Sequence, residues 1–528
     1  MAPARDLRPT PTDGYPTATS FLQQDIEDTL LAHLPQCLAS PDPTATQNVP
    51  AVLQRNNHMQ YLLRNLRQGF PQRYTGQDAS QAWLMYWILQ AFSCLGVGMD
   101  GETKRRAREK LLAMQNESGG FGGGPGQASH LLATYAAVSA LAVVGEPGPG
   151  GGWDDIDRKK MYDFFMSVKQ PDGSFLVCHH GEVDVRGLYC LLAVATLLNL
   201  LTQELLEGVP EFIASCQTYE GGFGNASFPD WAFSNGYDPT TPRPVLGEAH
   251  GGYTFCALAS WLFLQPYIRI RYQSTAAGIS AGVNHVPPTI NVRTLLRWLT
   301  NMQGTGIELG GFKGRTNKLV DGCYSWWVGG CFSLVDGLLG GASTATREPS
   351  NETATHAGNP PASTEDSEWH DIDDAIFNRE ALQEYILFAG QHPAGGLRDK
   401  PPKHPDSYHT LYCLAGLSAA QHRVVPDHSR RDDLLRSWNA DTARGTAVVT
   451  ASAGEQERLD NLRQESFLDA LCWLEDEGAD KFVGGSANRV NATQPLFNLT
   501  VTHTELIMAH FYQQRLPSRL PKTTSKSS

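Results

Sequence analysis

Apolar residues occur in two kinds of segment that alternate along this chain. Residues 157–168 and 292–299 place their apolar side chains at helical spacing, which predicts amphipathic helices with one buried face. Residues 189–198 are instead almost wholly apolar, which indicates a helix surrounded by other elements. Since amphipathic helices can cover such buried helices, the pattern predicts an all-α fold with an inner and an outer layer.

An internal repeat supports this arrangement. A Gln followed by a glycine-rich turn occurs at residues 115–121, 170–175, 217–223, 303–312 and 391–397. Predicted inner helices carry a Tyr in their first turn, and these are Tyr86, Tyr135, Tyr189, Tyr253, Tyr324 and Tyr412. Six copies predict six helix pairs arranged as an α-α toroid, with the inner ring enclosing a central aromatic-lined funnel.

The spacing of the repeat predicts the domain organisation. Successive signature tyrosines are 49, 54, 64, 71 and 88 residues apart, whereas a helix pair with its turns needs about 50. The excess predicts inserts at about 342–368 and 424–457, which we expect to be surface loops or disorder because they are polar. We therefore expect an N-terminal extension at 1–55, a catalytic toroid at 56–515 and a C-terminal tail at 516–528.

Charge and cysteine usage narrow the function classes. The chain has 528 residues, 42 Lys and Arg, and 55 Asp and Glu, for a net charge of −13. This balance argues against broad nucleic-acid binding. We identify no secretion signal and no apolar run long enough to span a membrane. The ten cysteines form no CxxC pair, which favours a reducing, cytoplasmic location.

The starts of the six inner helices meet at one mouth of the predicted funnel. They carry Trp83, Leu132, Arg186, His250, Asp321 and His409. Asp321 and Cys323 lie two residues apart, and His409 comes from the next inner helix. An Asp, Cys and His set supplies three zinc ligands and leaves a fourth position open, as in catalytic zinc sites. The alternative is a capping Asp, a core Cys and a His that is hydrogen-bonded in the core.

A second polar group adjoins these residues. Arg315 and Lys318 lie three apart on the turn before Asp321, and His250 comes from the preceding inner helix. Together with the Tyr324 hydroxyl they could bind one anion, and several donors around it favour a diphosphate over a carboxylate. The alternative is a solvated basic turn.

Aromatic side chains form a third group on the inner helices. An inner ring rich in aromatics can line a deep apolar pocket for a long hydrocarbon, although most such residues are ordinary core. The group comprises Trp83, Tyr86, Trp87, Tyr135, Tyr189, Tyr253, Trp326, Trp327 and Tyr412.

Two acidic segments suggest a different chemistry. Residues 371–374 match the acidic motif with which class II terpene cyclases, also α-α toroids, protonate a polyene, and residues 154–157 are similar. Both precede predicted outer helices, where acidic side chains favour the positive helix end. We therefore expect capping. The recurrent Gln…Trp turns of the cyclases are absent from this sequence.

Residues 55–515 resemble the β subunits of protein prenyltransferases. The resemblance rests on long strings at residues 119–127, 181–186, 247–253, 310–327 and 406–409. It implies that Asp321, Cys323 and His409 are catalytic zinc ligands, and that His250, Arg315, Lys318 and Tyr324 bind diphosphate, Tyr324 also being catalytic. It further implies an isoprenoid pocket that includes Arg186, Tyr189, Tyr253 and Trp327, and contacts to the lipid tail or the peptide from Trp83, Trp87, Tyr408 and Tyr412.

Within this family three residues match the farnesyl-transferring branch. Trp83 corresponds to a Trp that closes the pocket floor, Tyr412 agrees with the farnesyl pattern, and Asp399 matches a carboxylate linked to magnesium use. The resemblance implies transfer of farnesyl from farnesyl diphosphate to the Cys of C-terminal Cys-a-a-X motifs, in proteins such as Ras-like GTPases, with an α subunit as partner. The alternatives are a type I geranylgeranyl-transferring β subunit, a terpene-cyclase-like toroid and a non-catalytic scaffold.

Overall fold

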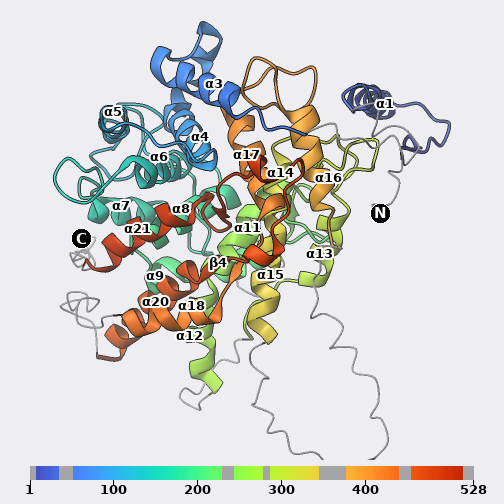
Figure 1. The fold of residues 1–528 in the computed structure, drawn as a ribbon. Helices are drawn as coiled ribbons and strands as arrows, with labels where there is room; N and C mark the ends of the chain where they lie inside the picture. Colours follow the sequence, from blue (N-terminus) through green and yellow to red (C-terminus); the bar gives the residue numbers. More distant parts are fainter. Residues whose placement is uncertain are drawn as a thin grey trace, which may run out of the picture.

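The fold is a closed double ring of helices. A computed structural model describes residues 7–34, 51–228, 243–276, 286–343, 376–438 and 453–514. Successive inner helices pack side by side, and the last of them packs against the first, which closes the ring. The predicted α-α toroid is confirmed (Figure 1).

The inner ring contains the helices that carry the signature tyrosines. They are nearly all buried along their length because each lies between two inner neighbours and is covered by further elements on its outer side. The inner helices are α4 (Gln81–Cys94), α6 (Leu131–Val144), α8 (Val185–Leu197), α11 (Gly251–Phe263), the broken pair α14 (Tyr324–Trp327) and α15 (Gly329–Ser343), and α17 (Ser407–Gln421).

One outer helix precedes each inner helix along the chain. Residues 157–168 and 292–299, predicted as outer helices, correspond to α7 and α13. The outer helices are α3 (Arg55–Gln68), α5 (Gly101–Leu112), α7 (Arg158–Ser167), α10 (Val209–Ser215) after the short α9 (Gln203–Leu206), α13 (Val292–Thr300), and α16 (Arg379–Glu384) with its continuation Tyr385–Gly390.

The repeated Gln of each turn has a structural role. The Gln303 amide donates to the Asn378 carbonyl at 2.9 Å and accepts from the Asn378 N–H at 2.8 Å. Gln217 makes the same pair of bonds with Asn291. Gln391 reaches Val52 and Gln54, just before α3. These three Gln residues therefore tie their turns to the residues before an outer helix, and Gln391 closes the ring.

A late segment of the chain covers the far end of the funnel. The hydroxyls of Tyr86, Tyr135 and Tyr189 donate to the carbonyls of Asn498, Phe497 and Leu496, at 2.8, 2.7 and 3.0 Å. Strands β5 (Thr493–Gln494) and β6 (Leu499–Thr500) pair antiparallel around this segment, and α21 (Val501–Tyr512) follows. Three inner helices are thus fastened to three consecutive peptide units.

The insert expected as loop or disorder at 424–457 is partly ordered. Strand β3 (Val424–Pro426) pairs with β4 (Trp473–Glu475), while α18 (His428–Ser437) and α12 (Gln265–Ala276) both pack on α20 (Ala453–Leu471). Arg431 reaches Glu465 at 2.7 Å, and Arg269 reaches Asp469 at 2.6 Å. The expectation of disorder was wrong here because these charged residues pair across helices.

The predicted N-terminal extension also contains a packed helix, α1 (Ala18–Leu31). Its Ile26 and Leu30 are buried in the core, and the Gln23 amide donates to the fully buried Glu308 at 2.9 Å. Nearly all of the insert at 342–368 and the tail at 516–528 lie outside the described residues. Within the described residues, no helix combines the length and apolarity that a membrane crossing requires.

Candidate active site

Asp321, Cys323 and His409 come together as predicted. Their ligand atoms lie within 4.8 Å of one another, and His409 Nε2 is 3.3 Å from Asp321 Oδ1. Asp321 precedes α14, Cys323 is its N-cap residue, and His409 lies in the first turn of α17. One imidazole nitrogen, one thiol and one carboxylate are a fitting donor set for zinc.

His409 is oriented by a residue that the sequence analysis did not identify. Asp406 is the N-cap of α17, and its Oδ1 accepts the His409 N–H at 2.7 Å. Its Oδ2 lies 2.7 Å from His409 Nδ1. Metal-binding histidines usually donate the second ring N–H to a carboxylate or carbonyl, so Asp406 directs Nε2 toward Asp321 and Cys323. The sequence signal was an Asp three residues before a candidate ligand, but it resembles an ordinary cap.

Cys323 connects this cluster to the aromatic funnel. Burial raises the pKa of its thiol well above the ordinary value, and the neighbouring Asp321 charge adds to the rise. Its side chain interacts with the Tyr408 hydroxyl, which also accepts a hydrogen bond from Trp327 Nε1 at 2.9 Å. The buried thiol gives up its proton only if a cation replaces it, as a bound metal would.

His250 and Tyr324 form the polar side of the funnel mouth. Tyr324 Oη lies 3.1 Å from His250 Nε2. His250 Nδ1 accepts the N–H of Gly252 at 3.0 Å, so the ring proton of a neutral His250 is on Nε2, pointing at Tyr324. The Tyr324 O–H is then free to donate to an anion. Burial, followed by the charges of Arg315 and Arg186, lowers the pKa of His250 to about 4.

Arg315 and Lys318 do not line the funnel in this structure. Arg315 Nη1 pairs with Glu248 Oε1 at 2.6 Å, and the Thr316 hydroxyl next to it donates to Glu220 at 3.2 Å. Lys318 is exposed on the same turn. The predicted anion group is therefore divided, with His250 and Tyr324 at the cavity and the two cations beside it.

The funnel encloses a cavity of about 270 Å³. Trp83 packs on Tyr135 with ring centroids 5.7 Å apart, and Trp327 packs on Tyr412 at 4.5 Å. The predicted residues that line it are Trp83, Trp87, Tyr135, Arg186, Tyr189, His250, Tyr253, Tyr324, Trp327, Tyr408 and Tyr412, and Leu132, Cys190, Gly252 and Cys256 complete the wall. Two of the aromatics expected there, Tyr86 and Trp326, are fully buried in the core instead.

Arg186 and Asp399 both have close partners. Arg186 pairs with Asp184 at 2.7 Å and lies over the Tyr253 ring, 5.2 Å from its centroid. Asp399 pairs with Lys400. Burial raises the pKa of Asp399, and the nearby charge of Asp321 raises it further. Asp399 is thus close enough to interact electrostatically with Asp321, one of the predicted zinc ligands.

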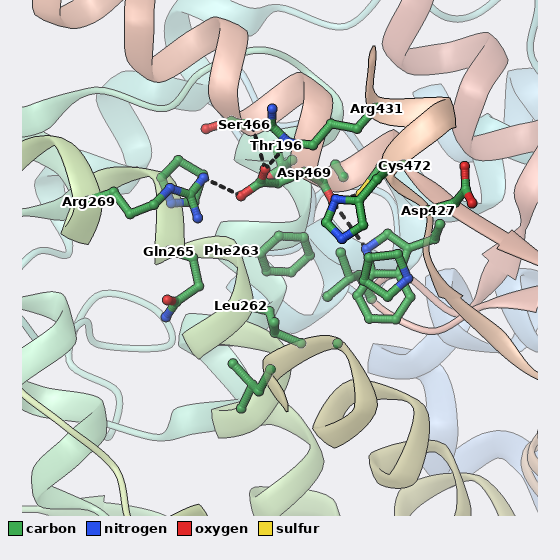
Figure 2. A pocket seen from close by; sticks show the side chains of 18 residues that line it. Thr196, Leu262, Phe263, Gln265, Arg269, Asp427, Arg431, Ser466, Asp469 and Cys472 are labelled. Atoms are coloured by element: carbon green, nitrogen blue, oxygen red, sulfur yellow. Dashed lines mark hydrogen bonds and ion pairs between the residues drawn. The ribbon is translucent and has the colours of Figure 1, made fainter. Parts of the chain in front are cut away.

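A second, larger cavity of about 510 Å³ lies among α11, α12, α15, α18 and α20. Figure 2 shows Asp469 between Arg269 and Arg431, above the apolar Leu262 and Phe263. No residue predicted for the site lines this cavity. Its arginines are already paired with carboxylates, so it offers a diphosphate no free cation from this pair.

The acidic segment at 154–157 caps a helix and pairs with a neighbouring side chain. Asp157 is the N-cap of α7 and accepts the Lys160 N–H at 2.9 Å, as expected for a cap. Asp154 pairs with His510 at 2.8 Å. Residues 371–374 lie outside the described residues.

Comparison with known proteins agrees with this geometry. Residues 53–499 match the family model described as the prenyltransferase alpha-alpha toroid domain. The protein farnesyltransferase subunit beta of Arabidopsis thaliana is 35% identical, over 72% of this chain and 76% of its own length. That of Saccharomyces cerevisiae is 38% identical, over 71% of this chain and 70% of its own.

A solved structure supports the fold. The structure described as Candida albicans protein geranylgeranyltransferase-I complexed with GGPP aligns with a TM-score of 0.52 and 17% identity, covering 88% of this chain and 99% of that one. At this identity it is informative about the fold alone. The toroid and the curated relatives together show that the chain belongs to the protein farnesyltransferase β-subunit family of prenyltransferases.

Proposed function

We propose that this chain is the catalytic β subunit of an enzyme that transfers farnesyl from farnesyl diphosphate to a protein cysteine near the C-terminus. One observation carries the proposal: the Asp321, Cys323 and His409 cluster opens beside an aromatic cavity whose polar edge is His250 and Tyr324. A nucleophile site, a leaving-group site and a hydrocarbon site are therefore adjacent.

Asp321, Cys323 and His409 would hold zinc. When bound, zinc lowers the pKa of a thiol and so makes a nucleophilic sulfur available at neutral pH. The chain's own residues fix the position of this reaction. Asp406 sets the orientation of His409, and the Cys323 N–H donates to Asp321 Oδ1 at 2.8 Å, which orients the carboxylate.

The diphosphate leaves with increased negative charge as its bond to C1 of the lipid breaks. Tyr324 can donate its O–H to that charge, and His250 can donate from Nε2 if Tyr324 turns to the anion. Such donors accelerate a reaction most when they are in place before charge develops. Arg315 and Lys318 lie on the adjoining turn, from which their long side chains can reach the same anion.

The aromatic cavity would hold the fifteen-carbon chain. Its rings exclude water, which would otherwise intercept a developing allylic cation. Trp83 packs against both Trp87 and Tyr135, so it limits the length of hydrocarbon that fits. This observation favours farnesyl over the longer geranylgeranyl group.

The family assignment supports an α subunit as partner, Cys-a-a-X proteins such as Ras-like GTPases as acceptors, magnesium as a second cofactor and a cytoplasmic location. Among the described residues that line the cavity, Arg186 is the one Lys or Arg. The other nearby cations, Arg315 and Lys318, lie on the adjoining turn. A partner that contributes one more Lys or Arg would complete the neutralisation of a diphosphate.

The test is co-expression with a protein farnesyltransferase α subunit, followed by zinc analysis and competition between farnesyl and geranylgeranyl diphosphate on a Cys-a-a-X peptide. We expect one zinc at the cluster and a preference for farnesyl. Trp83→Thr should shift that preference toward geranylgeranyl by at least tenfold. Retained zinc in Cys323→Ala at this cluster, or an unchanged preference in Trp83→Thr, would contradict the respective assignments.

A further inference from the structure

A second histidine lies at the opposite end of the helix that carries His409. His422 immediately follows the last residue of α17, and its side chain is fully buried. Its Nε2 is 2.8 Å from the carbonyl oxygen of Val490. Because a carbonyl can only accept a hydrogen bond, the proton of the ring must be on Nε2. In a neutral ring, Nδ1 of His422 then carries a lone pair and can only accept a hydrogen bond.

Nδ1 of His422 faces two carboxylates. Glu475 Oε1 lies 2.8 Å away and Asp480 Oδ1 lies 3.1 Å away. A neutral imidazole protonated on Nε2 has a lone pair on Nδ1, which would point at two further acceptors. The arrangement therefore requires a cation, which is either a second ring proton or a metal ion.

The charge around the cluster points the same way. Arg489 pairs with Glu475 at 2.7 Å and offsets one carboxylate. Asp480 pairs with His422 at 3.1 Å. Burial raises the pKa of Asp480, while His422 opposes the rise and the neighbouring Glu475 adds to it. Two carboxylates close together in a largely buried place are costly unless a cation lies between them.

The donor set and its spacing fit zinc. The three ligand atoms lie within 4.8 Å of one another. Ligand atoms around a tetrahedral zinc with bonds of about 2.0–2.1 Å are roughly 3.3 Å apart. The distances from His422 Nδ1 to the two carboxylate oxygens, 2.8 and 3.1 Å, would need to lengthen by only a few tenths of an ångström. The Val490 carbonyl on Nε2 is the usual outer partner of a metal-bound His, as Asp406 is for His409.

We propose that His422, Glu475 and Asp480 form a second zinc site, which fastens the far end of α17 to the last residue of β4 and to the segment that follows it. Glu475 already pairs in register with Val424 through the β3–β4 ladder. The ion would cross-link the end of an inner helix to two points of the 473–480 segment. Its role is structural, and it is separate from the proposed catalytic zinc at the other end of the same helix.

Zinc content tests the proposal without any assay of lipid transfer. The chain is purified with its α subunit from zinc-supplemented medium, freed of loose metal, and measured by plasma mass spectrometry. We expect two zinc ions per chain in the wild type and one in Cys323→Ala. Cys323→Ala combined with Glu475→Gln should retain none, because the isosteric amide keeps the shape of residue 475 and removes its charge.

Asp476→Asn in the Cys323→Ala background is the matched control. Asp476 is adjacent to Glu475 and half-exposed, and it pairs with Arg423 outside the cluster, so this variant should keep one zinc. If Cys323→Ala holds no zinc, or if the Glu475→Gln and Asp476→Asn combinations hold equal amounts, the site binds a proton and the proposal is overturned.

A second measurement covers the possibility that the double variant folds poorly. In the otherwise wild-type chain, Asp480→Asn alone should reduce the zinc content from two to one. A strong chelator should lower the Tm of Cys323→Ala but leave the Tm of folded Cys323→Ala/Asp480→Asn unchanged. Equal chelator sensitivity of these two proteins would also overturn the proposal.

Discussion

The backbone of Gly314 lies directly against the phenol ring of Tyr324. A Cβ at residue 314 would overlap the ring and its hydroxyl. The Gly314 carbonyl also accepts the N–H of Gly251 at 2.7 Å, at the start of the helix that His250 caps. A glycine is required here because the basic turn, Tyr324 and His250 can only then approach one another closely.

Gly314→Ala should therefore displace Tyr324 and lower kcat. The loss should match that of Tyr324→Phe, roughly 10-fold to 100-fold, as expected for one hydrogen bond of about 1.5–3 kcal/mol to a charged group. The double variant should be little worse than either single one, because both remove the same contact. Gly340→Ala is the control, since a Cβ there meets open space. Additive losses measured by steady-state kinetics would contradict this account.

Asp406→Asn should weaken zinc binding about 10-fold to 100-fold, the usual effect of removing an outer partner of a metal-bound His. Asn can still cap α17 through its side-chain oxygen, so the change isolates the loss of charge at His409 Nδ1. Competition with a chelator measures the zinc affinity. Asp427→Asn, at the cap of α18, should change nothing, and equal effects of both would indicate a capping role alone.

The affinity for farnesyl diphosphate should increase as the pH falls from 8 toward 5.5. His250 is neutral in the empty site because its pKa is lowered to about 4, and a bound anion raises that pKa and draws in a proton. His250→Gln removes the part of this pH dependence that does not come from the diphosphate itself. Calorimetry in two buffers would measure the proton uptake. Equal uptake by wild type and His250→Gln would contradict the prediction.

The same lowered pKa has a consequence for stability. The unfolded chain binds a proton at His250 near its ordinary pKa of about 6.5, whereas the folded chain does so only near 4. The folded state therefore loses stability as the pH falls from about 6.5 to 4 and gains none above that range. In His250→Gln this contribution should be absent from thermal melts recorded across these pH values.

Glu248→Gln should strengthen the binding of inorganic diphosphate. Glu248 forms an ion pair with Arg315, and an anionic ligand that binds Arg315 must displace the Glu248 carboxylate. Exposed ion pairs of this kind are worth about 0.2–1 kcal/mol, so we expect a Kd lower by roughly 1.5-fold to 5-fold. Glu220→Gln, whose side chain contacts Thr316 rather than a cation, is the matched control. A weaker Kd in Glu248→Gln would show that Glu248 instead holds Arg315 ready for the ligand.

Asp399→Ala should make turnover independent of magnesium. The Asp399 carboxylate pairs with Lys400, and the charge of Asp321 raises its pKa. Asp399 can therefore bind a divalent cation only if its ion pair with Lys400 breaks. Titration of kcat against magnesium in wild type and variant measures the effect. An unaltered response would leave Asp399 with a local role in its turn.

The sequence was sufficient to predict the ring and the three candidate metal ligands, because each depends on a position within a repeat. Asp321, Cys323 and His409 all fall at inner-helix starts, so the toroid necessarily brings them to one mouth. Asp406 and Glu248 were missed because an acidic cap and an exposed acidic residue are common everywhere. Their roles depend on distances that only the folded chain defines.

Helices α18 and α20 were missed for another reason. Polar composition usually indicates a loop, but α18 and α20 are stabilised by ion pairs between Arg431 and Glu465 and by Arg269 of α12. These ion pairs join residues about 35 to 200 positions apart, so the local sequence pattern of each segment could not predict them. Tyr86 and Trp326 were grouped with the aromatics that could line a pocket, whereas both are fully buried in the core.

The three tyrosine hydroxyls bonded to residues 496–498 determine when the funnel can exist during protein synthesis. Their helices α4, α6 and α8 are made in the first two fifths of the chain, but the carbonyls that accept from them emerge near its end. Until then the nascent inner ring has polar groups without their partners and an open base. Assembly of the lipid cavity is therefore one of the last events in folding, and truncation before residue 496 should abolish the cavity while leaving every predicted zinc and diphosphate residue in the chain.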